Sequence, residues 1–305
     1  MKFYTATAER MQINSDGNVA IGYNACTTMT TATQSVGIGQ SALKNIDTGS
    51  NNDAVGYEAM EGAANSSAAD NTAVGKAALY SNTTASNNTA VGYDALLLNT
   101  TGTENVAVGV SSGAALTTGG YSVAVGAYAL DAATTAAYNT AVGREALTSV
   151  TTGDSNTAVG RNAGSAITTG EQNVALGALA GDAITDAVRN TALGYSAMTA
   201  VTTGNNNTSI GGDSMLTATT GANNVAVGRE ALKRMTTASH NTAIGTESLK
   251  ENTTGANNVA VGYLAGLSNT TGGNNTAVGS GALKLNTTGL QNTAIGSDAL
   301  DENTT

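Results

Sequence analysis

The chain has no proline, no tryptophan, one phenylalanine, one cysteine and one histidine among its 305 residues. The single cysteine, Cys26, excludes an internal disulfide and leaves the redox compartment undetermined. No apolar run approaches the roughly 20 residues that span a bilayer, and residues 1–15 lack the apolar core of a signal peptide. We therefore expect no membrane insertion and no export signal in this chain. The inventory as a whole is unlike that of an ordinary globular enzyme.

Charge is also scarce, since only 11% of the residues are charged. The balance is acidic, with 22 Asp and Glu against 12 Lys and Arg and a net charge of −10. A surface of this sign repels nucleic acid and anionic lipid. We expect neither as a partner.

Glycine is abundant, with 38 residues, and many of them end a repeated phrase such as "NTAVG" or "NVAVG". These phrase-ending glycines are Gly22, Gly39, Gly56, Gly75, Gly92, Gly109, Gly126, Gly143, Gly160, Gly177, Gly194, Gly211, Gly228, Gly245, Gly262, Gly279 and Gly296. Of the 16 intervals between these 17 glycines, 15 are 17 residues long and the interval from Gly56 to Gly75 is 19. The extra pair falls in "GAANSSAAD", residues 62–70, which predicts a surface corner. Units this short cannot bury an apolar face alone, so the period predicts a solenoid.

The columns of the repeat predict a short strand that ends at the glycine. The residue before the glycine is Val, Ile or Leu, the one before that is Ala in 15 copies, and the third is Thr or Val except at Asp53. Alternating side chains of this kind are typical of a strand. We expect the Val, Ile and Leu column to lie in the core, and the Ala-rich face to meet further copies of the chain.

Asparagine occupies the strand entrance, four residues before the glycine, in 15 copies, and Ser35 and Ser122 replace it in the other two. Stacked at the strand spacing of about 4.7–4.8 Å, each amide can bond to the next one, which predicts a structural ladder. Its predicted members are Asn71, Asn88, Asn105, Asn139, Asn156, Asn173, Asn190, Asn207, Asn224, Asn241, Asn258, Asn275 and Asn292.

The second half of each unit, for example "REALKRMTTA", leaves two alternatives open. Apolar residues three, four and seven after the glycine, and the pairs Glu230 with Lys233 and Glu247 with Lys250, have helical spacing. Such a helix would be under two turns, which does not hold without tertiary contacts. A bent second strand is the competing prediction.

These observations together predict a mainly β chain: a parallel β-solenoid of 17-residue coils over residues 18–305, about 17 repeats, that stops in mid-repeat. Residues 1–17 are expected to form capping strands around the turn Asn14–Gly17. Each coil offers about two large aliphatic side chains, worth roughly 1.5–3 kcal/mol each on burial. Because this core is thin, we expect a homo-oligomer, and specifically a trimer.

The phrases "NVAVG", "NTAIG" and "SVAVG", each followed two residues later by Ala or Ser, resemble the head repeat of trimeric autotransporter adhesins. The resemblance covers residues 18–305 and implies a left-handed parallel β-roll with three chains around one axis. The unit is some three residues longer than the commonest adhesin unit. The start, "FYTATAERMQINSDGNVAIG", is similar to a segment of bacteriophage tail-fibre proteins that often precedes such repeats.

Catalysis is not expected, because no group of different titratable residues interrupts the repeat pattern at one place. His240 lies in a polar column and is expected at an exposed corner, while Cys26 replaces Leu in an apolar column and is expected to be buried and inert. No calcium-binding repeat and no paired Cys/His spacing occurs. We expect no enzyme activity, no cofactor and no metal.

One feature of the sequence suggests where a ligand could bind. It is a column of Tyr and Arg just after the glycine, whose side chains could stack on sugars or contact a protein. Its members are Tyr23, Tyr57, Tyr93, Tyr195, Tyr263, Arg144, Arg161 and Arg229. The alternative is that each Tyr merely covers the next coil.

The leading hypothesis is a non-catalytic fibre segment of a host-attachment device, a phage tail fibre on a virion, with a host-cell surface glycan or protein as its target. The alternatives are a bacterial surface adhesin of the trimeric autotransporter type and an ice-binding solenoid. The last is suggested by the Thr pairs eight and nine residues after most glycines.

Overall fold

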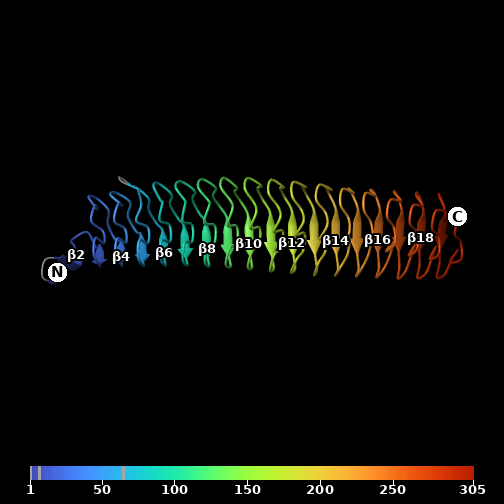
Figure 1. The fold of residues 1–305 in the computed structure, drawn as a ribbon, viewed down its shortest axis with the longest axis horizontal. Coiled ribbons are helices and arrows are strands. Elements are labelled where there is room, and N and C mark those ends of the chain that lie inside the picture. The colour runs from blue at the N-terminus through green and yellow to red at the C-terminus, as the bar shows by residue number, and fades with distance from the viewer. Residues whose placement is uncertain (1, 6–7, 64–65) are drawn as a thin grey trace. The chain divides into compact units, whose positions relative to one another are not determined.

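The structure is a computed structural model that describes residues 2–5, 8–63 and 66–305. The chain divides into two compact units, unit 1 from Met1 to Asp154 and unit 2 from Ser155 to Thr305. The described residues form β-strands and turns, with no helix among them. Within each unit the strands lie side by side, one to a coil (Figure 1).

Unit 1 contains ten strands, of which the last eight are three residues long and parallel. They are β1 (Lys2–Thr5), β2 (Ala8–Ile13), β3 (Val19–Ile21), β4 (Val36–Ile38), β5 (Asp53–Val55), β6 (Thr72–Val74), β7 (Thr89–Val91), β8 (Val106–Val108), β9 (Val123–Val125) and β10 (Thr140–Val142). Equivalent residues of successive coils face each other, as Val91 faces Val108 between β7 and β8.

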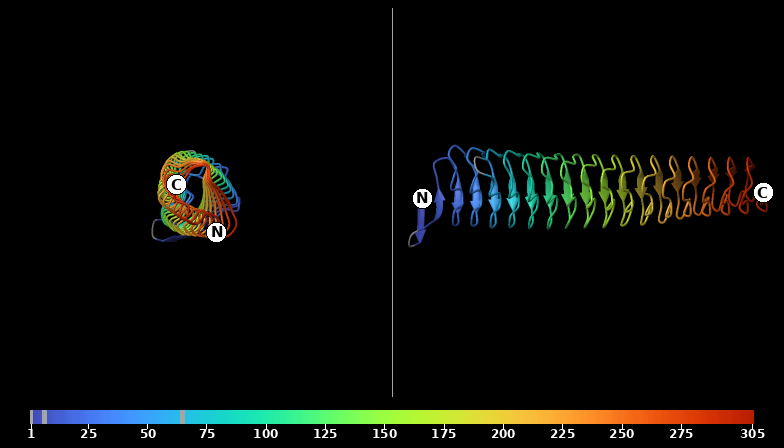
Figure 2. Two further views of the ribbon diagram at one scale, coloured as in Figure 1. Left: turned by 90° about the vertical axis from the view of Figure 1, so that its right-hand side faces the viewer. Right: turned by 45° about the horizontal axis from the view of Figure 1, so that its top comes forward.

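Unit 2 repeats the arrangement with nine parallel strands. They are β11 (Thr157–Val159), β12 (Val174–Leu176), β13 (Thr191–Leu193), β14 (Thr208–Ile210), β15 (Val225–Val227), β16 (Thr242–Ile244), β17 (Val259–Val261), β18 (Thr276–Val278) and β19 (Thr293–Ile295). Figure 2 shows the chain of each unit winding once per strand. The predicted parallel β-solenoid of 17-residue coils is therefore confirmed for each unit.

At the start of unit 1, β1 pairs with β2 and β2 pairs with β3, both antiparallel. The turn before β3 is closed by the Gly17 amide, which donates to the Asn14 carbonyl at 3.4 Å. Residues 1, 6 and 7 of the predicted capping segment lie outside the described residues. So do residues 64 and 65 of the predicted surface corner, beyond which Ser66 forms a parallel bridge with Ile46.

The strand faces are the reverse of those expected from the sequence. The central residue of each strand from β4 to β19 is small and buried, as Ala90 and Ala107 are, whereas the Val, Ile or Leu before the glycine lies on the outside and is up to 40% exposed in the interior coils, at Leu193 and Ile244. The prediction that this aliphatic column forms the core is wrong, and so is the prediction that the Ala face meets other copies.

The narrow interior of the coil explains the reversal. Leu or Met four residues after the glycine points inward, as fully buried Leu96 and Leu147 do, and faces the Ala of the strand. Where this residue is Gly181, an added Cβ would lie 3.6 Å from the Cβ of Ala175. Large side chains four and, in several coils, seven residues after the glycine, such as Leu147 and Val150, therefore fill the interior, and the strand side admits only small residues.

The second half of each coil is neither a helix nor a second strand, so both alternatives are wrong. It is a run of turns in which the residues two and four after the glycine have left-handed backbone, for example Asp94 with φ 55° and Leu96 with φ 50°. Gly takes the second of these positions in several coils, as at Gly113 with φ 59°.

This backbone sends its hydrogen bonds to the neighbouring coils instead of along the chain. The Asp94 amide donates to Lys76 of the preceding coil at 3.0 Å, and the Leu96 amide donates to Ser112 of the following coil at 3.0 Å. A helix of two turns could not satisfy these groups by itself. The coil-to-coil bonds do so all around the coil, which is why the turns outcompete both alternatives.

Candidate functional surfaces

The asparagines at the strand entrance form a buried hydrogen-bonded column, the first Asn ladder. The Oδ1 atom of Asn88 accepts from the backbone amide of Asn105 at 2.9 Å, and its Nδ2 donates to the Gly102 carbonyl at 3.0 Å. In unit 2 the same bonds join Asn207, Asn224 and the Ala238 carbonyl. Ser122 replaces one member in unit 1, and its hydroxyl still accepts the Asn139 amide at 3.2 Å.

A second Asn ladder lies seven residues after the glycine, where the sequence alternates between Asn and apolar residues. In unit 2 each Nδ2 donates to the preceding Oδ1 at 3.1 Å along Asn252, Asn269, Asn286 and Asn303. In unit 1 the side-chain amide of Asn99 is buried and neither of its polar atoms has a hydrogen-bond partner. Both ladders are structural, because they lie inside the coils.

The two threonines of each pair have different roles. The first hydroxyl of each pair donates to a carbonyl of the next coil, as Thr100 donates to Thr117 at 3.1 Å and Thr270 to Thr287 at 3.0 Å. The second threonine, such as Thr101 or Thr118, is exposed. Only one row of the pair therefore faces outward.

The predicted Tyr column is exposed but dispersed. Tyr57 and Tyr93 are separated by the coil that carries Lys76, whose Nζ lies 5.1 Å from the centre of the Tyr93 ring. In unit 2, Tyr195 and Tyr263 are four coils apart, counted by their strands β13 and β17. Tyr23 is exposed beside β3. No two members of this Tyr column occupy adjacent coils, so they form no continuous stacking surface.

The arginines of the same column are engaged by neighbouring polar groups. Arg144 pairs with Glu145 at 2.7 Å, and an Arg161 guanidinium nitrogen donates to Asn162 at 3.2 Å. Arg229 pairs with Glu230 at 2.8 Å and with Glu247 at 3.2 Å.

The Arg229 pairs belong to a larger ion cluster. Lys250 contacts Glu230 at 2.6 Å and Glu247 at 3.1 Å. The hydrogen bond from Lys250 is the main cause that lowers the pKa of Glu230 below its usual value. These charges neutralise one another, which leaves little free positive charge for an anionic ligand.

Two tyrosines outside the predicted column do meet. Tyr121 and Tyr138 lie five residues before the glycine in adjacent coils of unit 1, and their rings stack with centres 5.1 Å apart and planes 5° from parallel. His240 occupies the same column in unit 2 and is exposed. Sequence reasoning missed the pair, although Tyr in adjacent copies of one column is a visible signal.

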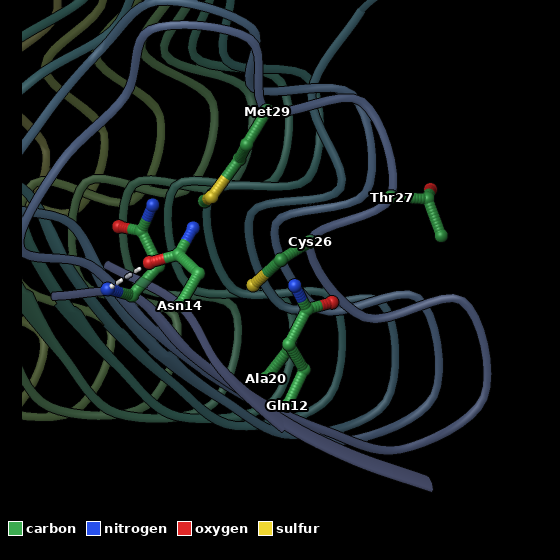
Figure 3. Close-up of a pocket in the computed structure, with 7 residues that line it drawn as sticks. Gln12, Asn14, Ala20, Cys26, Thr27 and Met29 are labelled. Atoms are coloured by element: carbon green, nitrogen blue, oxygen red, sulfur yellow. Dashed lines mark hydrogen bonds between the residues drawn. The ribbon is translucent and has the colours of Figure 1, made fainter. Parts of the chain in front are cut away.

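A cavity of about 210 Å³ lies at the start of unit 1, lined by Gln12, Asn14, Asn18, Ala20, Cys26, Thr27 and Met29. Figure 3 shows the side chains of Gln12, Asn14, Cys26 and Met29 around this space. Burial raises the pKa of the Cys26 thiol to about 12, so the sulfur is protonated and unreactive at neutral pH.

The part of the chain that the structure describes contains no group of three or more His, Cys, Asp or Glu side chains placed to hold a metal ion. Within the same residues, no helix has the length and apolar character needed to cross a membrane. Comparison of the chain with protein-family models, with curated proteins and with solved structures gives no match. The adhesin and tail-fibre resemblances therefore remain predictions from the motifs.

Proposed function

We propose that this chain is a structural segment of a host-attachment fibre that assembles with further copies of itself into a trimer. The observation that carries the proposal is the outward strand face of each unit, where two columns of Val, Ile, Leu and Thr stand in register from coil to coil. A row of half-buried to exposed aliphatic side chains over eight or nine coils is a contiguous apolar surface, and such surfaces mark sites of protein–protein contact.

The scarcity of charged residues on this face supports an apolar contact between copies. Among the three-residue strands β3 to β19, Asp53 is the one charged residue. The charged side chains lie instead on the turns, where Arg229, Glu230 and Lys250 pair with one another. An interface core depleted of charge is typical of stable homo-oligomers.

The motifs support a phage tail fibre as the leading role, since the start of the chain is similar to a segment of tail-fibre proteins, and the proposed location is a virion. A head of a trimeric autotransporter adhesin at a bacterial surface is the alternative. In both roles the chain is non-catalytic and its partners are its own copies and a host-cell surface glycan or protein.

Sedimentation equilibrium of the purified 305-residue chain tests the assembly. We expect a trimer, and we expect the double variant Val106→Lys/Val108→Lys to sediment as a monomer because both outward side chains of β8 become charged. The matched control, Thr101→Lys/Thr118→Lys, changes two exposed residues on another face and should stay trimeric. A monomeric unmodified chain would refute the proposal.

Ice binding is a second candidate, favoured by one observation. The outward face carries two in-register rows of mostly β-branched residues, such as Thr208 with Ile210 and Val225 with Val227, which is the flat alternating array that ice-matching surfaces use. Thermal hysteresis that is present in the unmodified chain and lost in Val106→Lys/Val108→Lys would favour this candidate. Absence of hysteresis in a trimeric chain would exclude it.

A further inference from the structure

The stacked pair Tyr121 and Tyr138 is held in place by the coil ladder. The Tyr121 amide donates to Thr103 of the preceding coil at 2.9 Å, and the Tyr138 amide donates to Gly120 at 3.1 Å. Both residues have left-handed backbone with φ 59°. Because adjacent coils are in register, the backbone places the two rings one coil apart and nearly parallel.

Both rings of the pair reach solvent. Tyr121 is 49% exposed and Tyr138 is 60% exposed. The residue before each tyrosine is small, Gly120 and Ala137, whereas the equivalent position in the preceding coil is Thr103.

The choice of side chain is specific to these two coils. The same column elsewhere holds polar residues such as Gln34, Asn87, Gln172 and His240, all with the same left-handed backbone. The backbone therefore does not require an aromatic residue at this position. The column also places Glu104, an exposed carboxylate, one coil before Tyr121.

The geometry points to a carbohydrate-binding platform: a hexopyranose stacks its apolar C–H face on an outer ring face of the Tyr121–Tyr138 pair, while the Tyr hydroxyls and the Glu104 carboxylate bond to sugar hydroxyls. Rigid aromatic rings supply contact area at a small entropy cost, and a few polar groups set orientation. This inference rests on the proposed host-attachment role and assigns its ligand class. An exposed platform of two rings predicts affinities in the millimolar range for a single sugar.

Ligand-observed NMR on the full chain tests this platform with the methyl glycosides of glucose, galactose, mannose and N-acetylglucosamine. We expect at least one to bind, and Tyr121→Ser/Tyr138→Ser to weaken it at least tenfold. Tyr121→Phe/Tyr138→Phe keeps both rings and should retain most of the affinity. Glu104→Gln should weaken binding less than loss of the rings. The matched control, Tyr195→Ser/Tyr263→Ser, removes two similarly exposed rings from unit 2 and should bind like the unmodified chain.

Three results would overturn the inference: no binding of any of the four glycosides, undiminished binding by the double Ser variant, or equal loss in the unit 2 control. Circular dichroism of each variant checks the fold, and the single variants Tyr121→Ser and Tyr138→Ser, each of which removes one ring of the stack, maintain the test if the double Ser variant unfolds. Because sedimentation and sugar binding are measured separately, a chain that sediments as a trimer without binding sugar would contradict only the platform. A monomeric chain would contradict the proposed fibre.

Discussion

At the scale of single residues, one column of the repeat shows how a hydrogen-bond network decides between a polar and an apolar side chain. Asn269 and Asn99 occupy the same position in their coils, and both are buried. Asn269 donates to Asn252 and to the Gly272 carbonyl and accepts from Asn286. Asn99 makes none of these bonds.

We predict opposite effects of Leu at these two positions. Asn99→Leu should raise the free energy of unfolding by ~1–3 kcal/mol because it removes a buried amide without partners. Asn269→Leu should lower the free energy of unfolding by a similar amount, because Asn252 and Asn286 would lose their hydrogen bonds to the Asn269 side chain. Urea denaturation of both variants checks the contrast, and destabilisation by Asn99→Leu would contradict it.

The Cys26 thiol gives a residue-scale prediction about pH. Burial raises its pKa from 9.0 to about 12, so at pH 8 the folded chain holds roughly 1000-fold less thiolate than the unfolded chain. Reaction with a disulfide reagent should be slow in buffer, fast in urea, and should accelerate in the folded chain as the pH rises. The unfolded chain loses its proton first as the pH rises through 9, so this group lowers folding stability above that pH. Equal labelling rates in buffer and urea at pH 8 would contradict this.

At the scale of elements, the glycine that follows each strand determines where the strand ends. The glycine after each strand has a backbone that other residues rarely adopt, as at Gly92 with φ 144°, and a Cβ there would collide with the carbonyl oxygen of Gly109 in the next coil. Gly212 is the residue directly after the strand-ending glycine of its own coil. It has no such backbone, and the atom nearest to an added Cβ is 3.9 Å away. The two glycines are a matched pair.

Gly92→Ala should therefore lower the free energy of unfolding by ~3 kcal/mol or more, because backbone strain and the collision add together. Gly212→Ala should change it little, within about 0.5 kcal/mol. Thermal unfolding of both variants is the measurement. Similar melting temperatures for the two would show that the glycine column is not required for stacking.

The strands could be predicted from the sequence because alternation of large and small side chains indicates a strand and no other element. The turns could not be predicted. Spacing of three and four residues indicates a helix, and the Glu230–Lys233 ion pair expected of one does form, at 3.4 Å, but on a turn. Hydrophobicity alone predicts the wrong strand faces, because the inward side chain of Leu147 leaves room only for a small residue such as Ala on the strand. The proposed sugar platform depends on adjacent Tyr121 and Tyr138, which the 17-residue period places in one column, but the stacking of their rings is given only by the structure.

At the scale of the whole molecule, net charge and the outward strand face oppose each other. The chain carries −10, so copies repel one another at long range, while the face proposed to join them carries almost no charge. Asp53 is the exception, an exposed carboxylate in a row otherwise made of Thr and Val. Association should therefore depend on salt in the direction of screened repulsion.

We predict that trimer formation becomes tighter as salt rises from 20 to 300 mM, because the screening length falls below about 10 Å over this range. Asp53→Thr should tighten assembly further and should reduce the salt dependence, since it removes the one charge within the face. Concentration-dependent sedimentation of both chains at each salt concentration measures this. An interface built on ion pairs would weaken with salt instead, and that result would move the proposed contact from the strands to the charged turns around Glu230.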